Sequence, residues 1–122
     1  MFRSAGTYLS MDNRRIHVAL AVRELNPSIR DYSARLGIEP CCVVAGSYAL
    51  WRTESLNLSI SADPAAAGTL RHLGLEDPDT PVVTMAKDVN GIEWERFTAA
   101  QQREEIRHKW PHTRFTDRKS GG

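Results

Sequence analysis

Four side chains in this sequence could take part in chemistry: the imidazoles of His17 and His72 and the carboxylates of Glu93 and Glu95. Imidazole binds metals and changes protonation near neutral pH, and a carboxylate can bind a metal or act as a general base. Each group also has an ordinary role. A single histidine on a strand is usually hydrogen-bonded within the fold, and an exposed glutamate is usually a solvated charge. The elements that carry these side chains therefore decide which role is favoured.

His17 belongs to a predicted strand, 15–22, whose two faces differ in size. Because side chains alternate along a strand, the residues separate into a large face and a small face: Ile16, Val18, Leu20 and Val22 against His17, Ala19 and Ala21. We expect the large face to cover a helix. The alanines of the small face leave room beside the imidazole.

A helix is predicted to follow this strand. Asn26 is its expected N-cap, Pro27 its first helical residue and Gly37 its C-terminal stop. The apolar spacing then predicts an inward-facing stripe of Ile29, Tyr32, Ser33 and Leu36.

Short strands make up most of the remaining chain. Alternating apolar residues and turn signals predict strands at 40–45, 48–52, 56–61, 70–75, 82–87 and 92–98. His72 lies in the fourth of these, and Glu93 and Glu95 share one face of the last. Residues 99–110 have helix-forming composition and end before Pro111. Residues 1–11 are expected to be a loose arm or a short edge strand, and the end of the chain a polar tail.

The composition excludes some classes of partner. Sixteen basic and fifteen acidic side chains nearly cancel, so we expect neither nucleic acid nor an anionic membrane surface as a partner. No leader sequence or membrane-spanning run is recognisable, which favours a cytoplasmic protein. The length fits one domain.

Cys41 and Cys42 are the only cysteines, and adjacent residues rarely form an unstrained disulfide, so reduced thiols are expected. A vicinal thiol pair could hold a soft ion or an arsenical. Neighbouring strand residues point to opposite faces, which favours two small packed hydrophobes instead.

Three segments together resemble the vicinal oxygen chelate superfamily of glyoxalases, bleomycin-resistance proteins and extradiol dioxygenases. The first, 15–40, is similar to the start of a βαβββ module. The second joins the Leu- and Asn-rich stretch 55–60 to Arg71-His72-Leu73-Gly74-Leu75, as in the cadmium-induced and organoarsenical-lyase branch. The third, 87–97, resembles the terminal hairpin in which a ligand Glu follows Gly by four positions.

The resemblance implies that His17, His72 and Glu95 hold a divalent metal, which could be Fe, Zn, Ni or Mn. Two imidazoles and one carboxylate leave positions open for a chelating small molecule or O₂. Lyase, isomerase and dioxygenase chemistry all remain compatible with these ligands. Glu95 and Glu93 are the candidate catalytic residues, Glu93 either as a general base or merely as a surface charge.

Two alternatives to a metal enzyme remain open: a metal-free protein of the bleomycin-resistance type that binds a small molecule, and a vestigial, non-catalytic dimer. Tyr48 and Trp51 could line the substrate cavity, although aromatic residues on strands more often pack within the sheet.

The second module is expected to be shortened, because the stretch from His72 to Glu95 is too short for a crossover helix and three strands. The expected fold class is α+β: a βαβββ module at 12–61, a truncated second module at 69–98, a C-terminal helix at 99–110 and a tail at 111–122, within one domain, 1–122. The strands should form a curved, mostly antiparallel sheet. Because the missing helix would leave an apolar face uncovered, we predict a homodimer, with helix 99–110 as a candidate cover.

Overall fold

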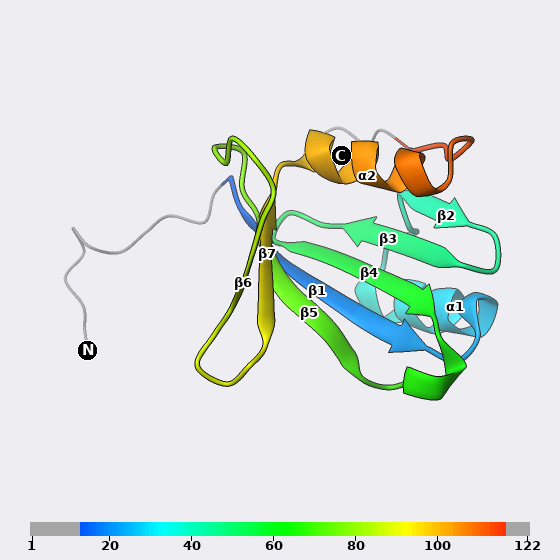
Figure 1. The fold of residues 1–122 in the computed structure, drawn as a ribbon. Coiled ribbons are helices and arrows are strands. Elements are labelled where there is room, and N and C mark those ends of the chain that lie inside the picture. The colour runs from blue at the N-terminus through cyan, green and yellow to red at the C-terminus, as the bar shows by residue number, and fades with distance from the viewer. Residues whose placement is uncertain (1–12, 117–122) are drawn as a thin grey trace.

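The computed structural model describes residues 13–116 (Figure 1). The predicted arm at 1–11 and the last six residues of the expected tail lie outside this range. The described chain forms two α-helices and a seven-stranded sheet, which confirms the expected α+β fold with a curved, mostly antiparallel sheet and a C-terminal helix. Neither helix is long and apolar enough to cross a membrane.

The elements follow one another in nearly the order that the sequence predicts. The first half of the chain contains β1 (Arg15–Val22), α1 (Leu25–Leu36), β2 (Cys42–Val44), β3 (Tyr48–Arg52) and β4 (Leu56–Ala62). After a short 3-10 helix at Pro64–Ala66, the second half contains β5 (Leu70–Glu76), β6 (Thr84–Lys87), β7 (Glu93–Phe97) and α2 (Ala99–Lys109).

The two halves of the sheet are ordered alike. The strand order is β2-β3-β4-β1-β5-β7-β6, with β1 and β5 antiparallel at the centre. Moving outward, β1 pairs in parallel with β4 and β5 pairs in parallel with β7. In each half the next strand is antiparallel. The second half has no counterpart of α1 or β2, because residues 77–83 join β5 to β6 without a helix.

Helix α1 covers the outer face of the first half, as the alternation in β1 predicts. Its apolar residues pack with Val18, Leu20 and Val22 of β1 and with Trp51 of β3. Gly37 ends the helix in the left-handed conformation, with φ of 71°, as expected. The predicted start was wrong: the helix begins at Leu25 after Glu24, because Leu25 is buried in the core. Pro27 is tolerated there because the amides of the first turn have no helical partner.

Helix α2 lies on the opposite, concave face, above the first-half strands (Figure 1). Ile106 packs with Cys42, Tyr48 and Leu50 in a second core. A capping box starts the helix, because the Thr98 hydroxyl accepts a hydrogen bond from the Gln101 amide and the Gln101 side chain accepts one from the Thr98 amide. The prediction that this helix covers the gap in the second half was therefore wrong. The apolar side of α2 packs against the strands of the first half instead.

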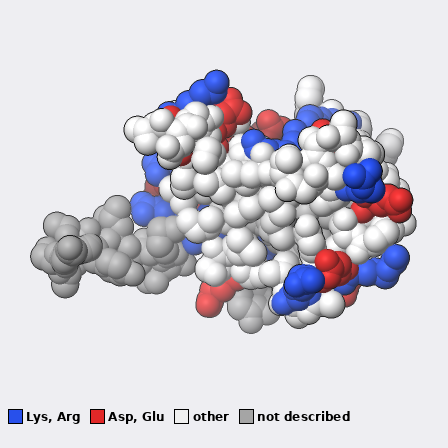
Figure 2. Space-filling view, turned by 90° about the horizontal axis from the view of Figure 1, so that it is seen from below, with Lys and Arg blue, Asp and Glu red and all other residues white. Residues whose placement is uncertain are grey.

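The outer face of the second half carries exposed apolar side chains. Ile16 lies opposite Leu75, and Leu73 lies opposite Trp94. Ile16 and Trp94 are both exposed. Seen from below, the middle of the molecule is largely free of charged side chains, which lie toward the rim (Figure 2). The homodimer stays a prediction.

Part of the expected polar tail is packed. Phe115 forms a bridge with Cys42 and joins the second core, and the Thr116 amide donates to the Cys41 carbonyl. The guanidinium groups of Arg103 and Arg107 lie over the Phe115 ring. The chain is thus held down as far as residue 116.

Candidate metal centre

His17, His72 and Glu95 meet on the concave face, where one ligand atom of each lies within 4.8 Å of the other two. The Nε2 atoms of the two histidines are 3.0 Å apart. Glu95 Oε1 lies 3.2 Å from His72 Nε2 and 3.8 Å from His17 Nε2. Three strands of the sheet thus bring together the three side chains that the sequence singled out.

The pairing of the strands explains this convergence. Gly74 of β5 lies opposite His17 on β1 and opposite Glu95 on β7, so these three positions form one row across the sheet. His72 is two residues before Gly74 and therefore on the same face. A Cβ on Gly74 would collide with the backbone carbonyl of Glu95 and lie 3.2 Å from His17 Cδ2. The glycine makes room for the two neighbouring ligands.

Asn57 fixes the protonation of His17. His17 Nδ1 lies 3.1 Å from the Asn57 backbone carbonyl oxygen and 2.9 Å from its side-chain Oδ1. A carbonyl oxygen can only accept a hydrogen bond, so Nδ1 carries the proton. The lone pair of the neutral ring is then on Nε2, which faces the other two ligands. This is the tautomer that a metal-binding histidine needs.

Burial keeps His17 in its neutral form. The residue is only 2% exposed, and burial lowers its pKa from 6.5, although hydrogen bonding to Asn57 acts in the opposite direction. Glu95 is charged instead. Burial raises the pKa of its carboxyl, but the hydrogen bond and charge of His72 outweigh this and the net shift is downward. At neutral pH the site therefore presents an anionic carboxylate at Glu95 and a neutral imidazole at His17.

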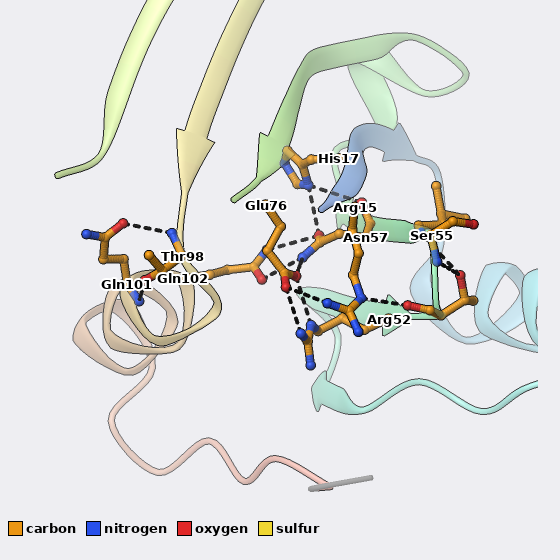
Figure 3. Close-up of polar contacts among 11 residues, drawn as sticks. Arg15, His17, Arg52, Ser55, Asn57, Glu76, Thr98, Gln101 and Gln102 are labelled. Atoms are coloured by element: carbon orange, nitrogen blue, oxygen red, sulfur yellow. Dashed lines mark hydrogen bonds and ion pairs between the residues drawn. The ribbon is translucent and has the colours of Figure 1, made fainter. Parts of the chain in front are cut away.

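A second layer of hydrogen bonds holds Asn57 in place (Figure 3). Its amide nitrogen donates to Glu76 Oε1 and to Gln102 Oε1, both at 2.8 Å. Gln102, from α2, donates back to Asn57 Oδ1 at 3.1 Å. Glu76 in turn accepts hydrogen bonds from Arg15 and Arg52. The orientation of His17 is thus tied to both α2 and a buried ion pair.

We expect Asn57→Ala to lower metal affinity about 10- to 100-fold, the usual effect of removing a group that orients a ligand. The substitution deletes the side-chain acceptor of His17 Nδ1 but leaves all three ligands in the chain. Isothermal titration with Zn(II) measures the affinity, and chemical denaturation reports the accompanying loss of stability.

Gln102→Ala is the matched control for Asn57→Ala. It removes both hydrogen bonds between Gln102 and the Asn57 amide group but leaves Asn57 bonded to His17 and to Glu76. We expect affinity to stay within about threefold of wild type, below the range for groups that orient a ligand. Equal losses of affinity in the two variants would contradict an orienting role for Asn57.

The donor separations fit a single metal ion. Bonds of about 2.1 Å place two ligand atoms about 3.0 Å apart at a right angle and about 3.4 Å apart at the tetrahedral angle. The observed distances of 3.0, 3.2 and 3.8 Å are close to this range. All three donors approach from the sheet, which leaves the side toward the cavity open. The group could therefore hold a metal ion.

The ligand group forms the floor of a cavity of about 320 Å³ between the sheet and α2. Tyr48 and Glu93 line it, as the sequence suggested. Trp51 does not: it is fully buried under α1, where its indole nitrogen donates to Ser33. The reason is spacing, since Tyr48 and Trp51 are three residues apart on one strand and so point to opposite faces. The further wall residues are Ser59, Ser61, Arg71, Met85, Phe97, Gln102, Glu105, Ile106, Lys109 and Trp110.

Two residues of this site were missed from the sequence. Asn57 was identified only as part of an alternating strand, although its place on the inward-facing side of that strand was a usable signal. Arg71 precedes His72 and by simple alternation should point to the opposite face. An irregularity in the pairing of β1 with β5 turns the Arg71 side chain toward the site. No local sequence pattern predicts this irregularity.

The cysteines do not form a second site. Cys42 is buried in the core with Tyr48 and Ile106, and Cys41 is half-buried. Burial raises the pKa of both thiols, that of Cys42 to about 12. Protonated thiols are poor ligands for soft ions, so the packing role is favoured.

No family model matches this chain, and no curated protein is similar enough to it to count as a relative.

Proposed function

We propose that this protein is an enzyme of the vicinal oxygen chelate type, which holds one divalent metal ion through His17, His72 and Glu95 and activates a small oxygen-chelating substrate. One observation carries the proposal: three ligand atoms from separate strands converge within 4.8 Å. The neutral tautomer of His17, with its unprotonated nitrogen toward the other two ligands, adds to it.

A divalent ion at this position would act as a Lewis acid and draw electron density from bound oxygen atoms. The chain's own residues supply the surroundings. Phe97 and Tyr48 give the cavity an aromatic wall, and burial raises the pKa of Tyr48, so its hydroxyl stays protonated. Glu93 lies on the same face as Glu95 at the exposed end of the cavity. Its carboxylate is our candidate for the group that takes a proton from a bound substrate.

The order of the strands also supports the proposal. The two halves of the sheet repeat one arrangement about the β1–β5 pair, and His17 and His72 lie on the first strand of each half. A curved sheet with paired halves, a shortened second half and ligands on these strands is what the resemblance to the superfamily implies. The chemistry stays open among lyase, isomerase and dioxygenase.

One observation favours the metal-free alternative. The polar atoms of the site satisfy one another without an ion, since His72 Nε2 lies within hydrogen-bonding distance of both His17 Nε2 and Glu95 Oε1. No buried side-chain nitrogen or oxygen among residues 13–116 lacks a partner. A binding protein that sequesters a small molecule in this cavity is therefore the second candidate function.

Metal titration distinguishes the two functions. The protein, purified without an affinity tag and stripped with a chelator, is titrated calorimetrically with Zn(II), Ni(II), Mn(II) and, without oxygen, Fe(II). We expect one ion to bind per chain, and His72→Ala to weaken binding at least about 100-fold, since losing a ligand should exceed the loss of a group that merely orients one.

His108→Ala serves as the control for His72→Ala, because it removes an exposed imidazole of α2 that does not line the cavity. Its metal affinity should equal that of wild type. Circular dichroism verifies that both variants are folded. If no ion binds wild-type protein stoichiometrically, the metal enzyme is rejected in favour of the binding protein.

A further inference from the structure

Arg71 faces the cavity because of a β-bulge. Ala19 of β1 pairs with His72, but the next residue, Leu20, pairs with Leu70, so Arg71 is an extra residue on β5. Both Arg71 and His72 line the cavity although they are adjacent in the chain. Bulges near functional sites often redirect a side chain in this way.

The guanidinium of Arg71 is held in this direction without being neutralised. Its Nη1 donates to the Ser61 hydroxyl at 2.9 Å. Within residues 13–116 no ion pair joins Arg71 to a carboxylate. An arginine that is anchored by a neutral group keeps most of its donors for a ligand.

The other charges of the cavity also favour an anion once the metal is bound. Lys109 adds a second cation, and its ammonium lies over the Trp110 ring. Glu93, Glu95 and Glu105 are the three carboxylates of the cavity. With a divalent ion present, the two basic side chains and the metal together exceed these carboxylates by one charge.

We propose that the substrate is a small carboxylate, which chelates the metal through two oxygen atoms and places its carboxylate group against Arg71. This inference rests on the proposed function for the chelating end of the substrate. Arginine suits such a group because its planar donors match a carboxylate in pairs. Tyr48, Phe97 and Trp110 line the same cavity and suit a flat or apolar body of the substrate.

The test uses two probes that differ by one charge. Protocatechuate and its amide share a chelating diol, but only the first carries a carboxylate. We expect metal-loaded wild-type protein to bind protocatechuate at least about tenfold more tightly than the amide. Arg71→Gln should reduce this ratio at least about fivefold and leave metal affinity and amide binding within about twofold of wild type.

Arg30→Gln is the matched control, because Arg30 is an exposed arginine of α1 on the other side of the sheet. It should keep the wild-type ratio. Ser61→Ala removes the anchor of Arg71 and should give an intermediate ratio. Equal binding of the two probes by wild type, an unchanged ratio in Arg71→Gln, or no binding of either probe at millimolar concentration would overturn the proposal.

Running the titrations with and without metal separates this proposal from the proposed function. If no ion binds but protocatechuate is still preferred through Arg71, the metal enzyme is rejected and the carboxylate subsite stands. If the ion binds and the probes bind equally, the carboxylate subsite alone is rejected.

Discussion

Gly74→Ala should destabilise the protein by about 3 kcal/mol or more and abolish metal binding, although alanine adds only one methyl group. That methyl would collide with the backbone carbonyl of Glu95 on the neighbouring strand. A backbone atom paired in a sheet cannot turn aside as a flexible side chain can. Relief requires β7 to move away from β5, and this movement takes Glu95 away from His17 and His72. Urea denaturation and calorimetric metal titration measure the two effects.

Gly46→Ala is the comparison for this substitution. Gly46 has a φ of 73°, and an added Cβ would meet nothing within 4 Å. Gly46→Ala should lower the free energy of unfolding by about 1–2 kcal/mol through backbone strain alone and leave metal binding intact. If Gly74→Ala behaves like Gly46→Ala in both measurements, the close approach of β5 and β7 does not position Glu95.

Glu76→Gln should lower the free energy of unfolding by about 3 kcal/mol at neutral pH. Glu76 is 4% exposed and accepts hydrogen bonds from Arg15, Arg52 and Asn57. The amide keeps the shape of the side chain but leaves two guanidinium groups without their carboxylate. Breaking a largely buried ion pair from one side is costly because the remaining charge is poorly solvated.

The same carboxylate makes stability depend on pH. Burial raises the pKa of Glu76, but hydrogen bonds from Arg52 and Asn57 and the charges of both arginines lower it below its ordinary value of 4.5. The unfolded chain therefore takes up a proton at higher pH than the folded one. The stabilisation from the ionised Glu76 carboxylate is therefore complete at neutral pH. It is lost as the pH falls from 4.5 toward the pKa of Glu76 in the folded protein. Chemical denaturation between pH 7 and about 3 should show that the free energy of unfolding falls more steeply for wild type than for Glu76→Gln.

Asp31→Asn provides the control for Glu76→Gln. Asp31 pairs with Arg35 on the surface of α1, where both side chains are more than half exposed. Such a pair contributes no more than about 0.5 kcal/mol. A similarly small effect of Glu76→Gln would mean that water already screens the Glu76 carboxylate.

Alternation alone predicted much of the site. The faces of β1 were assigned correctly because each residue follows the pleat of a regular strand, and His17 is on the face expected of it. Gly37 ends α1 because only glycine readily adopts that conformation. Such features depend on neighbours in the chain, so the sequence contains the information needed.

The features that could not be predicted from the sequence depend on contacts with distant parts of the chain. Helix α2 has few apolar residues, and its composition does not say which face of the sheet it covers. Arg71 turns inward through a bulge that is defined by its pairing with β1. The partners of Asn57 come from β5 and α2. Such contacts follow from the assembled sheet rather than from local pattern.

The central place of β1 has a consequence for how the protein folds. Both strands that flank β1 come much later in the chain: His17 meets Asn57 40 residues on and His72 55 residues on. Among residues 13–116, β1 is the first strand to be synthesised, and it has no sheet partner until β4 follows. Because distant pairings require large loops to close, folding should be slow for a chain of this size. The ligand group is completed only when β7 docks, so the centre cannot form on a nascent chain that ends before Glu95.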